Sequence, residues 1–365
     1  MSENAYEGYR GKAREILEKF NVKVWSVVEI TTKIGVFRGI ILPRYQLADD
    51  KHITIKLPTG YNTGLNVDEI IEIKEIGYEP GRYKLPSPSV KPDEKKPRIP
   101  LLGCGGTIAS RLDYRSGAVI PALTPEELYS MVPELADIAF VYPRLLFELF
   151  SENMAPEHWI KIAKEVEKEI NERGAYGVVL GHGTDTMSFT AAILSFMLRN
   201  LPAPVVLVGS QRSSDRPSSD AAMNLINAVT LASKGDIAEV TVCMHGTTSD
   251  NYSLIHRGTR VRKMHSSRRD AFRTIGDIPL GKVENGKIIM FKKDYRKRFS
   301  GNVIADVKLE DRVALIYFYP GMKPDVIHHF IDTGYKGIVI AGTGLGHVSI
   351  YLFDAIKRAI DENIP

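Results

Sequence analysis

The sequence has little of what marks several large classes of protein. Only two cysteines, Cys104 and Cys243, occur among its 365 residues, which argues against a disulfide framework and favours a reduced, cytoplasmic setting. No apolar run approaches the roughly 20 residues of a membrane-spanning helix, and residues 1–20 lack the apolar segment of a signal peptide. A net charge of +4 is too small to indicate nucleic-acid binding by itself. The content of 44% hydrophobic and 25% charged residues is typical of a globular protein.

Several motifs of nucleotide, metal and ester chemistry are missing as well. There is no phosphate loop of the Walker type, and the glycines at 342–346 lack the third glycine of a dinucleotide fingerprint. The Gly-x-Ser-x-Gly elbow of α/β-hydrolases is absent. No spacing of metal ligands is visible, so we expect no metal site in this chain.

Residues 1–84 differ in pattern from the rest of the chain. A short amphipathic helix is predicted within 2–20, and the β-rich runs that follow predict a small β-barrel. The predicted strands are 23–31, 35–42, 52–56 and 69–75. Residues 85–98 are rich in proline and charge, which indicates a semi-stiff linker between domains.

From residue 99 onward, strand patterns alternate with helical patterns, which predicts a doubly wound α/β domain with a parallel sheet over 99–290. Within this part we expect 246–260 to be a polar loop. Residues 282–303 carry two strand-like pieces and are expected to bridge two lobes. After a connection at 291–312, a second, smaller α/β lobe is predicted over 313–365. It shows two strands and two helices, so we expect it to be incomplete at its C-terminus.

The stretch 181–188, Gly-His-Gly-Thr-Asp-Thr-Met-Ser, organises the chemistry of the chain. It follows a buried strand pattern at 176–180 and precedes a helical pattern at 189–198. Such a turn lies at the carboxyl end of a strand, where open α/β sheets bind ligands. It offers the Thr184 hydroxyl, the Asp185 carboxylate and helix N-terminal amides that can stabilise an oxyanion. The alternative is an ordinary helix N-cap formed by Asp185 or the residue after it.

Two further strand-end turns, 105–110 and 209–214, are rich in glycine and hydroxyls, and the three turns can converge on one pocket. Thr107 heads the first turn, and its hydroxyl needs a group that removes its proton. Lys263 is a candidate base, because the pKa of a lysine falls when it is buried near other cations. The alternative is that its arginine-rich surroundings form a solvated face or a phosphate-binding patch. Tyr114 lies in the loop after Thr107 and can share a hydrogen bond with its hydroxyl.

At this point the motifs resemble a known family. Residues 101–110 (LLGCGGTIAS) and 181–187 (GHGTDTM) resemble the two signatures of the L-asparaginase and glutaminase family of amidohydrolases. Residues 151–154 (SENM) look like the family's Ser-Gln-Asp-Met substrate loop, and Lys263 falls where the family keeps its catalytic lysine. The resemblance covers 99–365 and implies hydrolysis of the carboxamide of glutamine or asparagine, with release of ammonia.

Carried over to this sequence, the family's roles give a catalytic set and a substrate-binding set. Thr107 would attack the amide carbon with help from Tyr114, and Thr184, Asp185 and Lys263 would handle proton transfer and the hydrolytic water. The substrate-binding set would be Tyr114, Ser151, Glu152 and Gly183, together with Asp185.

Some residues depart from the family's pattern or have another expected role. Cys104 stands where the first signature usually has threonine, and we expect it to be a small buried substitute. Glu152 replaces the usual glutamine, which should alter how the substrate amine is held. His182 is expected to be structural, because it precedes the exposed apex of its turn.

The N-terminal barrel and linker resemble instead the D subunit of archaeal Glu-tRNA(Gln) amidotransferases. This implies a cytoplasmic ligase of protein biosynthesis in which a partner, the E subunit of such enzymes, binds Glu-tRNA(Gln), activates it with ATP and Mg, and accepts the ammonia. This chain would then need no cofactor of its own and would form a homodimer within a heterotetramer. The alternatives are a free cytosolic L-asparaginase with an extra module and a catalytically silent RNA-docking or scaffold protein.

Overall fold

The computed structural model describes residues 5–44, 48–59, 61–79, 93–105, 110–112, 119–121, 125–212 and 218–365. Thr107, Tyr114 and most of the predicted linker lie outside these residues. Two compact units divide the chain. The first comprises Met1–Met154 and Lys161–Ala305, and the second comprises Ala155–Ile160 and Asp306–Pro365.

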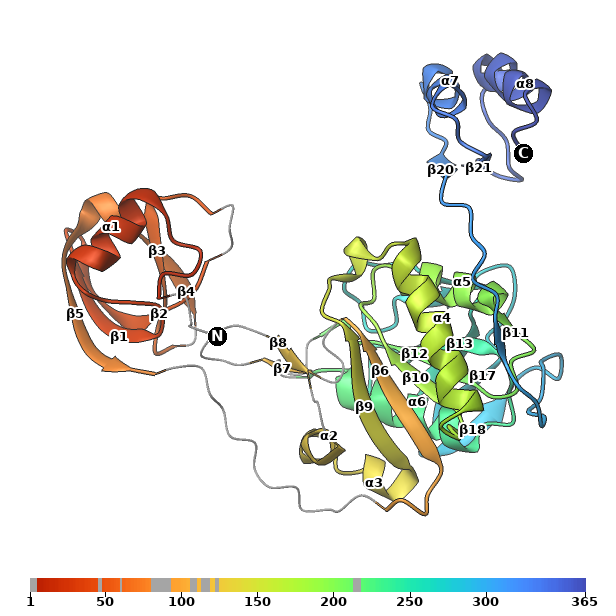
Figure 1. The fold of residues 1–365 in the computed structure, drawn as a ribbon, viewed down its shortest axis with the longest axis horizontal. Helices are drawn as coiled ribbons and strands as arrows, with labels where there is room; N and C mark the ends of the chain where they lie inside the picture. The colour runs from red at the N-terminus through yellow and green to blue at the C-terminus, as the bar shows by residue number, and fades with distance from the viewer. Residues whose placement is uncertain are drawn as a thin grey trace. The chain divides into compact units, whose positions relative to one another are not determined.

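The N-terminal part is an antiparallel sheet with one short helix. Its strands follow the order β4-β3-β2-β1-β5 (Figure 1). The bounds are α1 Gly11–Lys19, β1 Ser26–Thr32, β2 Gly35–Ile41, β3 His52–Lys56, β4 Asn62–Asn66 and β5 Ile70–Tyr78. Leu17 of α1 packs in one buried core with Val28 and Ile30, which alternate with outward-facing residues along β1. The predicted β-rich N-terminal part is confirmed as an antiparallel sheet, and its closure into a small barrel stays a prediction.

Two details of this part differ from the prediction. The helix begins only at Gly11, because Arg10 is extended, with φ −144° and ψ 169°. Strand β4 was not predicted, since its sequence, Asn-Thr-Gly-Leu-Asn, is poor in strand-forming residues. It forms because it pairs with β3 over its whole length, from His52↔Asn66 to Lys56↔Asn62.

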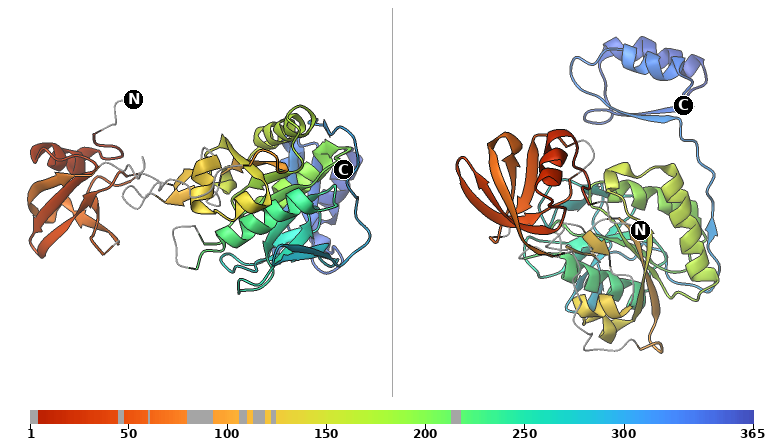
Figure 2. Two further views of the ribbon diagram at one scale, coloured as in Figure 1. Left: turned by 90° about the horizontal axis from the view of Figure 1, so that it is seen from below. Right: turned by 60° about the vertical axis from the view of Figure 1, so that its left-hand side comes forward.

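The central part is built on a larger sheet, in the order β18-β17-β14-β13-β12-β10-β6-β9. Its strands are β6 Arg98–Cys104, β9 Phe140–Phe147, β10 Val178–Gly181, β12 Val205–Val208, β13 Val240–His245, β14 Ser253–Arg257, β17 Gly281–Glu284 and β18 Lys287–Met290. Its helices are α2 Pro125–Met131, α3 Leu135–Ile138, α4 Pro156–Asn171, α5 Met187–Met197 and α6 Ala221–Lys234. Helices lie on both sides of the sheet (Figure 2). Strands β10 and β12 are buried along their whole length, as expected of central parallel strands.

The predicted parallel sheet is confirmed for its central strands, and antiparallel strands extend it at one edge, so the whole sheet is mixed. Strands β9, β6, β10, β12 and β13 run parallel, whereas β14, β17 and β18 each run antiparallel to the preceding strand. The predicted loop 246–260 thus contains β14, and the predicted bridge 282–303 supplies most of β17 and β18. These strands are short and mixed in polarity, so their strand character comes from pairing with β13 and with one another.

The register of the parallel strands brings the predicted turns to one edge. Gly103 of β6 pairs with Gly181 of β10, and Gly181 pairs with Val208 of β12. The chain therefore leaves all three strands at nearly the same level of the sheet. This is the carboxyl edge, where a doubly wound sheet places its ligands.

The C-terminal lobe has its own small core. Strands β20 Val313–Tyr317 and β21 Gly337–Ala341 pair in parallel, and helices α7 Asp325–Asp332 and α8 Phe353–Asp361 follow them. Ile316, Ile327 and Leu352 belong to one buried cluster of this lobe. The predicted smaller α/β lobe with two strands and two helices is confirmed.

Candidate active site

The turn after β10 carries the first two groups of the site. Thr184 is buried, and Asp185 beside it is exposed. The ordinary N-cap interpretation does not hold, because Thr186 makes no capping hydrogen bond to the start of α5. Its hydroxyl instead donates to the carbonyl oxygen of Ser151, at 2.7 Å. The turn is therefore tied to the 151–154 segment, and Thr184 and Asp185 remain available for other contacts.

Lys263 supplies the third group from a distant part of the sequence. It ends β15 (Val261–Lys263), which pairs with β16 (Phe272–Thr274) in a short hairpin. Its Nζ donates to Thr184 Oγ1 and to Asp185 Oδ1, each at 2.8 Å. The lysine side chain is 10% exposed, whereas that of Asp185 is 68% exposed. The structure thus joins a hydroxyl, an amine and a carboxylate, with the amine between the two oxygens.

The 151–154 segment reaches the same turn. It contains a short 3-10 turn, η2 Ser151–Asn153, in which Ser151 is buried and Glu152 exposed. A Cβ atom on Gly183 would lie 2.7 Å from Ser151 Cβ and 2.8 Å from Ser151 Oγ. Real Cβ atoms do not approach this closely, so only glycine permits the contact at 183. The structure therefore brings Ser151 and Gly183 together beside Thr184.

Glycines also bring the other two turns close. A Cβ on Gly209, directly after β12, would lie 2.9 Å from Thr184 Cγ2. Gly105, directly after β6, has φ +91°, and a Cβ there would lie 2.0 Å from the carbonyl oxygen of Leu149. The first turn thus starts beside the segment that leads to Ser151. Thr107 follows Gly105 by two residues and, like Tyr114, lies outside the described residues.

His182 and Cys104 lie near the site, but neither provides a charged or nucleophilic group to it. The Nδ1 atom of His182 lies 2.7 Å from the Gly183 carbonyl oxygen, and Nε2 lies 2.9 Å from Thr190 Oγ1. Burial lowers the pKa of His182 to about 4, which keeps the ring neutral. Burial also raises the pKa of the Cys104 thiol to about 12, so no thiolate forms at neutral pH. Cys104 is fully buried, as predicted.

Three of the arginines near Lys263 in the sequence form ion pairs with carboxylates. Arg257 pairs with Glu239, Arg268 with Asp270, and Arg269 with Asp250. Sequence reasoning missed these acidic partners, because each pair except Arg268–Asp270 joins residues far apart in the chain. A bare phosphate-binding patch of these three arginines is not what the structure contains.

Fold and site together define a class of protein: an α/β amidohydrolase of the asparaginase kind. The family model of the asparaginase N-terminal domain matches residues 98–296, and that of the glutaminase/asparaginase C-terminal domain matches residues 312–365. A third family model, the GatD N-terminal domain, matches residues 22–76. The thermostable L-asparaginase from Thermococcus kodakarensis is similar in structure, with a TM-score of 0.62 and 32% identity, over 73% of this chain and 77% of that one.

Curated relatives narrow the family further. The chain is 56% identical to the D subunit of the glutamyl-tRNA(Gln) amidotransferase of Pyrococcus furiosus, over 97% of this chain and 82% of the relative. It is 50% identical to the protein of the same name from Methanopyrus kandleri, over 98% of this chain and 80% of the relative. The chain belongs to the family of glutamyl-tRNA(Gln) amidotransferase D subunits.

The described part of the chain shows neither a membrane span nor a metal cluster. None of its helices has the length and apolar character needed to cross a membrane. In the same residues, no group of three or more His, Cys, Asp or Glu side chains is arranged to hold a metal ion.

Proposed function

We propose that this chain hydrolyses the side-chain amide of glutamine, or of asparagine, and supplies the ammonia for tRNA-dependent formation of Gln-tRNA(Gln). The observation that carries the proposal is the pair of 2.8 Å contacts from Lys263 Nζ to Thr184 and Asp185. Amide hydrolysis needs a hydroxyl with a proton acceptor close by, and this cluster provides one at the carboxyl edge of the sheet. Membership of the D-subunit family supports the destination of the ammonia.

The proposed reaction proceeds in two stages. The Thr107 hydroxyl adds to the amide carbon, its proton is transferred to the leaving nitrogen, and the C–N bond breaks to release ammonia. Water then adds to the resulting ester, and the threonine is released together with the free acid. Thr184, Asp185 and Lys263 move the protons of these steps, because a lysine amine held between a hydroxyl and a carboxylate can accept a proton from one and share its charge with the other.

Substrate positioning follows from the segments that meet at this turn. Ser151, Glu152 and Asp185 would hold the α-amino and α-carboxylate groups of the substrate, with Gly183 allowing the close approach of Ser151. Tyr114 would assist Thr107. Backbone amides at the start of α5 would stabilise the oxyanion.

The remaining steps belong to a partner. An amide-forming step on Glu-tRNA(Gln) needs an activated carboxylate, so the amidotransferase's E subunit would bind the tRNA, use ATP and Mg, and accept ammonia. This chain would need no cofactor of its own. We place the assembly in the cytoplasm as a homodimer of this chain within a heterotetramer, as the family resemblance implies.

The test compares ammonia release from glutamine by the chain alone with release in the presence of the partner, ATP and Glu-tRNA(Gln). We expect release to rise when the partner and the charged tRNA are added. Equal rates under both conditions would favour a free L-asparaginase, the function named for the similar Thermococcus structure. If no ammonia is released from glutamine or asparagine under any condition, the alternative of a catalytically silent scaffold protein is favoured.

A further inference from the structure

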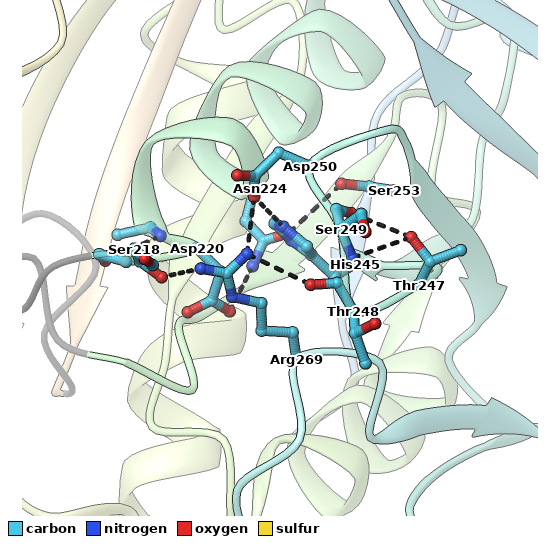
Figure 3. A network of polar contacts seen from close by, with 12 residues as sticks. Ser218, Asp220, Asn224, His245, Thr247, Thr248, Ser249, Asp250, Ser253 and Arg269 are labelled. Atoms are coloured by element: carbon cyan, nitrogen blue, oxygen red, sulfur yellow. Dashed lines mark hydrogen bonds and ion pairs between the residues drawn. The ribbon is translucent and has the colours of Figure 1, made fainter.

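A series of polar contacts around His245 and Arg269, shown in Figure 3, does not take part in the chemistry proposed above. It begins at the carbonyl oxygen of Gly209, which accepts from Asn224 Nδ2 at 3.1 Å. Asn224 Oδ1 lies 2.7 Å from His245 Nδ1, and His245 Nε2 lies 2.9 Å from Asp250 Oδ1. Arg269 donates to the same Asp250 oxygen at 3.0 Å. The contacts thus connect the turn after β12 with the loop that follows Lys263.

The orientation of each member is fixed by its neighbours. Asn224 Nδ2 donates to two acceptors, Gly209 and Asp220, each at 3.1 Å, so its Oδ1 must face His245. His245 therefore has an acceptor oxygen at both ring nitrogens, from Asn224 and from Asp250. These two contacts hold the fully buried ring of His245 between Asn224 and Asp250.

Arg269 forms the other end of this series of contacts, and we call its set of hydrogen bonds the clamp. It lies in the loop between β15 and β16, and its side chain is mostly buried. Besides Asp250 it donates to the carbonyl oxygen of Thr248, at 3.3 Å, and to that of Ser218. Ser218 has φ +59°, a strained conformation for a residue with a side chain. The guanidinium thus joins its own loop to two other segments, one with Thr248 and Asp250 and one with Ser218.

Both ends of the network meet the catalytic cluster. Gly209 packs closely against Thr184, because a Cβ atom added to Gly209 would lie 2.9 Å from Thr184 Cγ2. Lys263 is the residue at which β15 passes into the loop that Arg269 clamps. The hairpin that holds Lys263 has strands of only three residues, extended by backbone hydrogen bonds from Met264 to Ala271 and from Ile275 to Arg260. In such a short hairpin, contacts from outside can help to set the position of the amine relative to the hydroxyl.

We propose that Arg269, anchored by Asp250 and His245, is a positioning residue that holds the Lys263 amine against Thr184. The proposal rests on the proposed function, since it assigns a role toward the same amide hydrolysis. Without the clamp the loop can shift, and a displacement of about 1 Å in such a site can cost about 100-fold in rate. Arg269 acts through the loop, because the residues it bonds, Thr248 and Asp250 in one loop and Ser218 in another, are outside the catalytic set.

The test is Arg269→Gln with Arg268→Gln as its matched control. The two arginines are neighbours on the same loop, but Arg268 pairs with Asp270 inside that loop. We expect Arg269→Gln to lower kcat for ammonia release at least about 10-fold with KM within about 3-fold. Arg268→Gln should keep kcat within about 2-fold, and both proteins should melt within a few degrees of the unsubstituted chain.

The pH profile separates positioning from general loss of folded protein. The pH dependence of kcat reports the essential acid and base groups of the enzyme–substrate complex. A displaced amine shifts that profile along the pH axis, whereas a smaller folded fraction lowers it by the same factor at every pH. A kcat equal to that of the unsubstituted chain, or a profile that is only scaled, would overturn the proposal.

A variant that does not fold and an inactive unsubstituted chain each have a defined consequence. If Arg269→Gln does not fold, Asp250→Asn carries the same prediction, because 59% of that side chain is exposed and its loss should leave the fold intact. If the unsubstituted chain releases no ammonia with partner and charged tRNA present, the proposed function itself fails. An active unsubstituted chain with an equally active Arg269→Gln protein rejects the positioning role alone.

Discussion

Lys263→Met separates a catalytic role of the amine from a structural one. The substitution keeps an unbranched side chain and removes the two 2.8 Å hydrogen bonds to Thr184 and Asp185. Because Asp185 is 68% exposed and stays hydrated, the ion pair contributes only about 1 kcal/mol to folding. That loss corresponds to a fall of about 2–4 °C in melting temperature for a domain of this size. Loss of general acid–base catalysis should lower kcat/KM about 10²–10⁴-fold.

The matched control for this prediction is Lys292→Met. Lys292 also forms an ion pair with an aspartate, Asp277, at 2.7 Å, and its side chain is similarly sheltered at 18% exposed. Its hydrogen bond holds the pKa of Asp277 below the usual range, so the pair contributes to stability. We expect Lys292→Met to melt at a similar or lower temperature than Lys263→Met and to keep full activity. An enzyme-coupled ammonia assay and thermal melting provide both measurements. Lys263→Met activity within about 10-fold of the unsubstituted chain would refute the catalytic role.

Three further predictions follow from the surroundings of the site. Gly183→Ala should push the buried Ser151 out of place, costing about 1–3 kcal/mol of stability and raising KM for glutamine; an unchanged KM would contradict the contact. Burial lowers the pKa of His182 from 6.5 to about 4 in the folded protein. Below pH 6.5 the unfolded chain therefore binds a proton that the folded chain does not. The free energy of unfolding should fall as the pH drops from 6.5 toward 4, by at most about 1.4 kcal/mol per pH unit. Urea midpoints at about pH 7 and about pH 5 measure this fall, which His182→Gln should reduce. Cys104 and Cys243 are buried with pKa values raised to about 12, so a maleimide should label neither thiol until guanidinium unfolds the chain.

The strands and helices with strong local patterns could be predicted from the sequence. The apolar run before Gly181 and the helical period after Ser188 predict β10 and α5 within about two residues, because both are set by burial in the immediate neighbourhood. Strands β4 and β14 could not be predicted in this way. Both are short and contain polar or weakly strand-forming residues, and each exists because a neighbouring strand offers it hydrogen bonds.

The residues of the site also fall into those that local sequence predicts and those that depend on the completed fold. Thr184 and Asp185 were predictable from one turn, since the end of a parallel strand is where open sheets bind ligands. The contact of Lys263 with Thr184 joins residues 79 positions apart. Its basic surroundings made Lys263 only one candidate base, and the family resemblance favoured it over a solvated basic face. The clamp formed by Arg269 and Asp250 gave no local signal, because a salt bridge between two loops depends on the completed fold.

The most direct measurement is mass spectrometry of the chain after incubation with a glutamine analogue that carries an electrophilic diazoketone in place of the carboxamide. A nucleophilic threonine at the site should displace nitrogen gas and leave one covalent adduct per chain, on the peptide that contains Thr107, with slower labelling in Lys263→Met. No adduct in protein that is releasing ammonia, or an adduct outside the turns that carry Thr107 and Thr184, would contradict the account.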